Sequence, residues 1–174
     1  MKQPFIILSG PKFSGKSALA SQLAKRIKNG GQTVSGFFQR GVFENGEKIG
    51  YDLAPACGGL MEPIIRRGAD GKWNFFPEAF EKAAELVTEA DAIILDEIGP
   101  LEISGSGHNR ALKKALDFSG AIIVVVRDSL ADELVKYASG RTVEIVSFDP
   151  VKSKKAEDKI AGILNIKSEN IVKQ

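Results

Sequence analysis

Short hydrophobic runs alternate along the chain with longer segments in which apolar residues recur every three or four positions. The short runs have the length of buried strands and fall at residues 5–8, 33–38, 92–95, 121–126 and 142–148. The longer segments have the period of amphipathic helices and fall at residues 16–28, 77–90, 109–118, 129–137 and 154–164. This alternation predicts an α/β fold with a mainly parallel sheet flanked by helices, which binds ligands at the carboxyl ends of its strands.

The alternation is interrupted between about residues 40 and 76. Asn45-Gly46 and Asp70-Gly71 each separate two short strand-like segments, which is the sequence pattern of a β-hairpin. We therefore expect a β-hairpin-rich insertion within a single domain that spans residues 1–174. Farther along, Ser129 is expected to be the N-cap of the helix that follows it.

Residues 10–17 read Gly-Pro-Lys-Phe-Ser-Gly-Lys-Ser and connect the first predicted strand to the first predicted helix. This is the pattern G-x-x-x-x-G-K-[ST] of a phosphate-binding loop, in the strand-to-helix context that the pattern requires. The glycines let backbone N–H groups turn toward phosphate oxygens, the lysine adds positive charge, and the serine offers a hydroxyl to Mg²⁺. The predicted nucleotide-binding residues are Gly10, Pro11, Lys12, Phe13, Ser14, Gly15, Lys16, Ser17 and Ala18. Phe13 stands where many such loops have glycine.

An acidic pair, Asp96 and Glu97, follows the apolar run at residues 92–95. At the carboxyl end of a strand opposite a phosphate-binding loop, Asp96 is placed to orient Mg²⁺ together with Ser17. Glu97 is placed to accept a proton from an attacking water molecule. The expected ligands are therefore Mg²⁺ and a nucleoside triphosphate such as ATP, with Lys16 and Glu97 as catalytic residues.

The segment Asp96-Glu97-Ile98-Gly99-Pro100-Leu101-Glu102 resembles the DEIGP-[ML]-E signature of the small P-loop nucleoside-triphosphatases, which include thermophilic enzymes and the cancer-related nucleoside-triphosphatase. Gly36-Phe37-Phe38 and the stretch from Gly46 to Leu53 are also similar to that family. The resemblance implies a RecA-like P-loop fold in which one strand separates the loop strand from the carboxylate strand. It also implies Mg²⁺-dependent hydrolysis of nucleoside 5′-triphosphates with broad base tolerance, with Lys16 and Ser17 on phosphate and metal, Asp96 on metal, and Glu97 activating water.

Phosphoryl transfer requires further positive charge near the phosphates. Arg127 follows the apolar run at residues 121–126 and is our preferred catalytic arginine, with Arg40, Arg66, Arg67 and Arg110 as alternatives. The single histidine, His108, is interpreted as a surface residue at the start of a helix. The aromatic residues Trp73, Phe75 and Phe76 are assigned to core packing, as is Cys57.

Composition and charge bear on the partners and the location that we expect for the protein. The net charge of +2, with basic residues spread along the chain, carries no strong nucleic-acid signal. No apolar run approaches the roughly 20 residues that cross a bilayer, so we expect no membrane partner. A single cysteine suits a reducing compartment, and a cytoplasmic monomer or weak oligomer is the expectation.

Two other functions stay open at this point. One is a nucleotide or nucleoside kinase whose phosphate acceptor binds near Gln39, Arg40 and residues 51–59 in the insertion. The other is a nucleotide-gated binding module that hydrolyses poorly and reports its state to a partner. Phosphate acceptors that stimulate turnover distinguish the first from hydrolysis, and tight binding with negligible turnover distinguishes the second.

Overall fold

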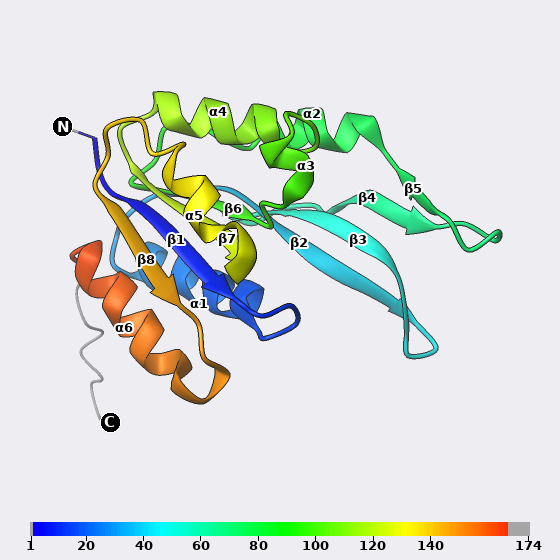
Figure 1. Cartoon of the computed structure of the whole chain (residues 1–174), viewed down its shortest axis with the longest axis horizontal. Coiled ribbons are helices and arrows are strands. Elements are labelled where there is room, and N and C mark those ends of the chain that lie inside the picture. Colours follow the sequence, from blue (N-terminus) through cyan, green and yellow to red (C-terminus); the bar gives the residue numbers. More distant parts are fainter. Residues whose placement is uncertain (1, 167–174) are drawn as a thin grey trace.

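The computed structural model describes residues 2–166 and joins the strands of that region in one eight-stranded sheet (Figure 1). The strands are β1 (Phe5–Gly10), β2 (Val34–Glu44), β3 (Glu47–Pro55), β4 (Glu62–Arg67), β5 (Trp73–Phe75), β6 (Ala92–Asp96), β7 (Ala121–Arg127) and β8 (Val143–Ser147). The helices are α1 (Lys16–Asn29), α2 (Pro77–Glu85), α3 (Pro100–Ile103), α4 (Asn109–Asp117), α5 (Ala131–Val135) and α6 (Ser153–Ile163), with short 3₁₀ helices at Asp128–Leu130 and Pro150–Lys152. The strand order is β5-β4-β3-β2-β6-β7-β1-β8.

The five strands β2, β6, β7, β1 and β8 form the parallel part of the sheet. β7 lies between the loop strand β1 and the carboxylate strand β6, which confirms the strand placement expected for a RecA-like P-loop fold. Because side chains alternate across a strand, β1 supplies both faces of the sheet. Phe5 and Ile7 pack on the side of α2, α4 and α5, whereas Ile6 and Leu8 pack on the side of α1 and α6.

The expected hairpin-rich insertion is an antiparallel extension of the same sheet. Asn45-Gly46 forms the turn between β2 and β3, and Asp70-Gly71 lies in the turn between β4 and β5. Pairing of β2 with β6 ends at Phe37, yet β2 continues to Glu44. The β2–β3 hairpin therefore projects past the carboxyl edge of the parallel strands (Figure 1).

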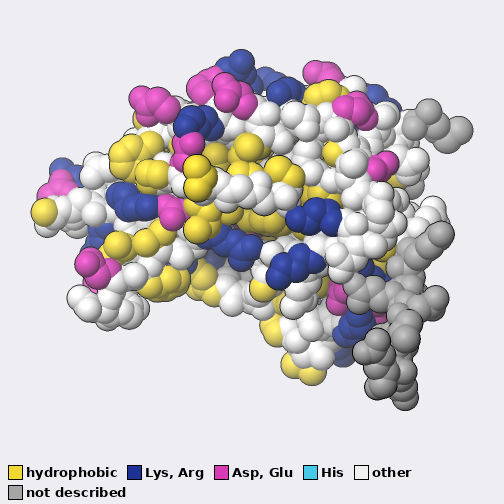
Figure 2. Space-filling model, turned by 180° about the vertical axis from the view of Figure 1, so that it is seen from behind, with side chains coloured by type: hydrophobic (Ala, Val, Ile, Leu, Met, Phe, Trp, Pro, Cys, Tyr) yellow, Lys and Arg dark blue, Asp and Glu magenta, His cyan; other side chains and the backbone are white. Residues whose placement is uncertain are grey.

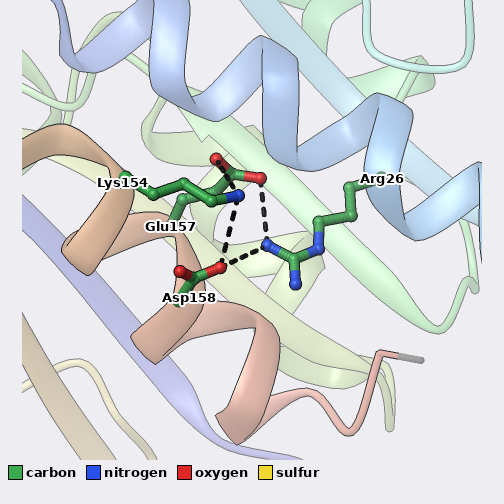
Figure 3. A network of polar contacts seen from close by, with 4 residues as sticks. All are labelled: Arg26, Lys154, Glu157 and Asp158. Carbon is green, nitrogen blue, oxygen red and sulfur yellow. Dashed lines mark hydrogen bonds and ion pairs between the residues drawn. The ribbon is translucent and has the colours of Figure 1, made fainter. Parts of the chain in front are cut away.

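An ion-pair network holds α6 against α1 (Figure 3). Arg26 of α1 donates to Glu157 at 3.0 Å and to Asp158 at 2.9 Å, and Lys154 lies 3.3 Å from Glu157 and 3.4 Å from Asp158. The hydrogen bond from Arg26 lowers the pKa of Asp158. The network crosses from one helix to the other, so it stabilises their packing at the rim of the hydrophobic contact.

Several local expectations are wrong. The helix predicted to 90 ends at Glu85, and Ser129 lies inside a 3₁₀ helix rather than at an N-cap, with Leu130 preceding α5. The aromatic residues assigned to the core, Trp73, Phe75 and Phe76, are 44%, 48% and 37% exposed, because they lie in or next to β5 at the edge of the sheet. Cys57 is exposed as well. None of the helices in residues 2–166 combines the length and the hydropathy needed to traverse a lipid bilayer.

Candidate active site

The loop between β1 and α1 has the backbone of a phosphate cradle. Its turns use positive φ at Phe13 (61°) and Gly15 (104°), and α1 begins directly after Gly15 without a side-chain cap. The first N–H groups of a helix have no partner within the helix, and together with its dipole they favour an anion. A positive φ is strained for a residue with a side chain, so glycine is the usual choice where Phe13 stands.

The Lys16 ammonium group folds back over this loop. Its Nζ donates to the carbonyl oxygens of Gly10 at 2.9 Å and Pro11 at 2.6 Å. Burial lowers the pKa of Lys16, while the nearby carboxylates of Glu97, Asp128 and Asp96 act in the opposite direction. The lysine is therefore a positive charge held within the loop.

Ser17 and Asp96 meet on the other side of the cradle. The Ser17 hydroxyl donates to Oδ1 of Asp96 at 2.9 Å, although the two residues come from α1 and β6. Asp96 is fully buried, and its Oδ2 has no hydrogen-bond partner. Burial raises the pKa of Asp96 from 3.8 to about 7. A buried carboxylate with a free oxygen beside a hydroxyl is a donor set that suits Mg²⁺.

Glu97 faces a cleft of about 530 Å³ that runs from the phosphate cradle to the β2–β3 hairpin. The Nε of Arg127 at the end of β7 lies 3.3 Å from Oε1 of Glu97, and both side chains are partly exposed at 44% and 35%. The cleft is lined by Lys12, Phe13, Ser14, Gly15, Lys16, Ser17, Ala18, Gln39, Arg40, Gly41, Phe43, Lys48, Tyr51, Asp96, Glu97 and Val125. The fold thus brings the loop and the acidic pair into one space.

The segment that follows Glu97 is held by the buried carboxylate of Glu102. The N–H of Gly99 donates to Oε2 of Glu102 at 2.7 Å, and the N–H of His108 donates to Oε1 at 2.9 Å. The N–H of Ile98 donates to the carbonyl of Val125 at 2.9 Å. Glu102 therefore ties α3 and the start of α4 to the turn that carries Glu97. A glutamate three residues after the N-cap, as in half of a capping box, is a sequence signal that could have indicated this role.

His108 is completely buried, so its interpretation as a surface residue is wrong. Its ring packs against Phe37 and Phe80 with centroid distances of 4.4 Å and 4.9 Å, and burial lowers its pKa to about 3. Neutral His108 accepts at Nε2 a hydrogen bond of 2.9 Å from the side-chain amide of Gln39. The buried histidine thereby fixes the side chain of Gln39, which lines the cleft.

The other arginines considered for catalysis differ in whether they line the cleft. Arg66 pairs with Asp52, Arg67 with Glu47 and Arg110 with Glu81, so these three are engaged outside the cleft. Arg40 lines the cleft, and Arg127 contacts Glu97. Sequence reasoning missed Phe43 and Lys48, which reach the cleft because the hairpin folds over its edge.

These features define the class of protein. A loop with the P-loop sequence after β1, an acidic pair at the end of β6 and one strand between β1 and β6 make up a P-loop NTPase of RecA-like topology. A family model described as NTPase matches residues 5–161, and the chain belongs to this family of hydrolases that act on nucleoside triphosphates.

Named relatives agree with that membership, and solved structures share the fold. The chain is 26% identical over 160 residues to a nucleoside-triphosphatase THEP1 of Methanopyrus kandleri, which covers 87% of this chain and 89% of the relative. It is 26% identical over 138 residues to the cancer-related nucleoside-triphosphatase of Homo sapiens, covering 68% and 72%. The solution structure of a human cancer-related nucleoside triphosphatase superimposes with a TM-score of 0.71, 21% identity and coverage of 97% and 100%. The crystal structure of THEP1 from Aquifex aeolicus gives a TM-score of 0.64, 16% identity and coverage of 93% and 99%.

Proposed function

We propose that this protein is a Mg²⁺-dependent nucleoside-triphosphatase that releases the γ-phosphate of ATP and other nucleoside triphosphates to water. The observation that carries the proposal is the meeting of three groups in one cleft: the cradle with Lys16, the buried Ser17–Asp96 pair, and the partly exposed Glu97. Each group matches a requirement of phosphoryl transfer, namely phosphate binding, metal binding and positioning of the nucleophile.

The residues from Gly10 to Ala18 bind the phosphate chain through backbone N–H groups and the dipole of α1. Lys16 leaves its contacts with the carbonyls of Gly10 and Pro11 and turns to the outer phosphates. This exchange is favourable because a phosphate oxygen is a stronger, charged acceptor. The loop thus holds the nucleotide with the γ-phosphate toward β6.

Ser17 and Asp96 fit a magnesium ion, because Oδ2 of Asp96 is buried without a partner and oxygen ligands suit this ion. A bound Mg²⁺ supplies positive charge against the phosphate oxygens. The same charge compensates for the burial of the Asp96 carboxylate. The donor set thereby explains why a carboxylate with a raised pKa is kept in this position.

Glu97 orients the attacking water and accepts its proton, and Arg127 holds the carboxylate toward the cleft. In-line attack breaks the bond between the γ-phosphorus and the bridging oxygen, leaving the nucleoside diphosphate. Arg127 also adds positive charge near the γ-phosphate as negative charge develops there. The roles of Glu97 and Arg127 are linked by their ion pair at 3.3 Å.

The test is phosphate release with ATP, GTP, CTP and UTP, measured with Mg²⁺ and with a chelator. Glu97→Gln is expected to keep nucleotide affinity and to lower kcat by about a hundredfold or more, because general-base catalysis is worth that much. Lys16→Ala is expected to weaken nucleotide binding itself. Glu85→Gln is the matched control, since Glu85 is an exposed glutamate at the end of α2. Unchanged turnover in Glu97→Gln removes Glu97 from the mechanism.

A further inference from the structure

The cleft runs from the cradle to the β2–β3 hairpin, beyond the region that an attacking water molecule occupies. One end holds the cradle and the acidic pair, and the far end is walled by the β2–β3 hairpin, with Gln39, Arg40, Phe43, Lys48 and Tyr51 facing it. A water molecule attacking the γ-phosphate occupies only the region next to Glu97. The total volume of about 530 Å³ falls in the range of small-molecule sites.

The hairpin wall stands on the γ-phosphate side of the cleft. β2 is the neighbour of β6, and β3 is the next strand outward, while Lys48 of β3 reaches back to within 4.6 Å of the ring centroid of Phe13 in the loop. After its last pair with β6 at Phe37, β2 runs on for the seven residues 38–44. At about 3.3 Å per residue, this overhang reaches about 23 Å past the pairing. A ligand against it lies on the side of β6, where the proposed function puts the γ-phosphate.

Two cations on this wall are outside ion-pair distance of any carboxylate of the described residues, although Arg40 is close enough to Asp96 to act against the rise of its pKa. Among residues 2–166, neither Arg40 nor Lys48 forms an ion pair. Arg40 donates to the Ser21 hydroxyl at 2.8 Å and Lys48 to the Tyr51 hydroxyl at 3.2 Å. Other basic side chains of the insertion do have acidic partners, as in Arg66 with Asp52. Unpaired cations facing a cleft indicate a site for an anion.

Aromatic rings surround the lysine of this pair. Lys48 Nζ lies 4.6 Å from the ring centroid of Phe13, 4.7 Å from that of Tyr51 and 5.3 Å from that of Phe43. Phe13 is 76% exposed despite its hydrophobic side chain. Figure 2 shows hydrophobic and basic side chains side by side on the half of the molecule that carries the hairpins. Ring faces beside a cation suit a ligand that is both planar and anionic.

We propose that the hairpin end of the cleft is an acceptor subsite for a nucleoside monophosphate, which takes the γ-phosphoryl group in place of water. The phosphate of this acceptor binds Arg40 and Lys48, and its base lies against the rings of Phe13, Phe43 and Tyr51. The inference rests on the proposed function, since the same bound triphosphate is the donor.

The transfer balances without any further reactant. An ionised phosphate oxygen of the acceptor forms a bond to the γ-phosphorus, while the bond from the γ-phosphorus to the bridging oxygen breaks. The electron pair stays on the β-phosphate of the leaving diphosphate, and the products are two nucleoside diphosphates. Since the acceptor phosphate is largely dianionic near neutral pH, no proton has to be removed. Glu97 is needed for water and not for this nucleophile.

The experiment follows the label of γ-³²P-ATP with Mg²⁺ and the full-length protein. AMP, GMP, CMP and UMP are the acceptors, and label in a nucleoside diphosphate is measured against label in inorganic phosphate. Lys48→Gln and Arg40→Gln are each expected to lower the ratio of labelled diphosphate to labelled phosphate about tenfold, the effect of losing one charge-assisted contact. Lys72→Gln and Arg67→Gln are matched controls outside the cleft and are expected to keep the wild-type ratio.

Two further acceptors test the contributions of the acceptor's phosphate and of its base separately. Ribose 5-phosphate offers the anion without a base, and adenosine offers the base without the anion. Label entering ribose 5-phosphate as readily as the monophosphates overturns the role of the rings, and label entering adenosine equally well overturns the role of the cations. Phosphate release that depends on Lys16, with no label in any acceptor, overturns the subsite and leaves the proposed hydrolysis intact. If the wild type neither releases phosphate nor labels any acceptor, the proposed function is contradicted.

Discussion

Asp96 and His108 are buried titratable groups whose pKa values move in opposite directions. Burial raises the pKa of Asp96 from 3.8 to about 7 and lowers that of His108 from 6.5 to about 3. A pKa that differs between folded and unfolded chains makes the free energy of unfolding depend on pH. Removing either group alone should therefore change how the free energy of unfolding depends on pH. The sign of the change differs between the two groups and so identifies which one was removed.

The signs follow from proton binding. Between pH 3.8 and about 7 the folded chain holds a proton on Asp96 that the unfolded chain has lost, so this group makes stability fall as pH rises. Between about pH 3 and 6.5 the unfolded chain holds a proton on His108 that the folded chain excludes, so this group makes stability rise with pH. Each effect amounts to about 1.4 kcal/mol per pH unit. In the shared window the two nearly cancel in the wild type.

The assay is urea unfolding in a chelator at about pH 6 and about pH 4.5, for the wild type and three variants. Asp96→Asn should lose about 2 kcal/mol relative to the wild type on going to the lower pH, because only the histidine effect is left. His108→Leu should gain about 2 kcal/mol over the same interval. The double variant should follow the wild-type profile, and it controls for all other titrating groups.

The difference between the two single variants should thus change by about 4 kcal/mol across the interval. Stability that a variant loses through poorer packing does not affect this comparison, because that loss is the same at both pH values. Parallel profiles for the wild type and both single variants would show that neither group is buried in the state described here. In that case the argument for a metal-binding carboxylate in a dry pocket would fail with it.

Three other substitutions test separate parts of the structure. Gly36→Ala should destabilise the fold by about 3 kcal/mol or more, because the added Cβ would lie 2.0 Å from the Ile94 carbonyl oxygen at a φ of +94°; wild-type thermal stability would contradict this strand contact. Glu102→Ala should remove about 2 kcal/mol of stability, because it leaves two N–H groups without acceptors. The same variant should lower kcat more than it raises KM. A change in KM alone would contradict the link between Glu102 and Glu97. Arg26→Gln should speed amide exchange in α6 severalfold without affecting β7, and equal protection in both elements would show that the α1–α6 network contributes nothing.

Much of the architecture could be predicted because local patterns carry it. The apolar runs and the helical periods located the parallel strands and their helices, and Asn45-Gly46 and Asp70-Gly71 located two hairpins. The phosphate-binding loop was identifiable because its glycines, lysine and serine are consecutive in the chain. Asp96 followed from the same reasoning, since the carboxyl ends of parallel strands meet at one edge of the sheet.

The failures concern residues whose surroundings come from distant segments. His108 has the sequence context of an exposed helix start, yet Phe37 and Phe80 enclose it. Trp73 and Phe75 have the composition of a buried strand, yet β5 forms the edge of the sheet. Burial depends on which elements pack over a position, and hydrophobicity along the chain does not determine that packing.

The sequence by itself determined the class of fold and the position of the loop that we propose binds phosphate, because backbone conformation and strand–helix alternation are local properties. Only the tertiary structure decided that the Ser17 hydroxyl meets the buried Asp96 carboxylate and that Arg127 contacts Glu97. The same holds for the hairpin wall that brings Arg40 and Lys48 into the cleft, with Lys48 next to Phe13 of the loop. Those contacts join segments tens of residues apart, and their distances are set by sheet order and packing.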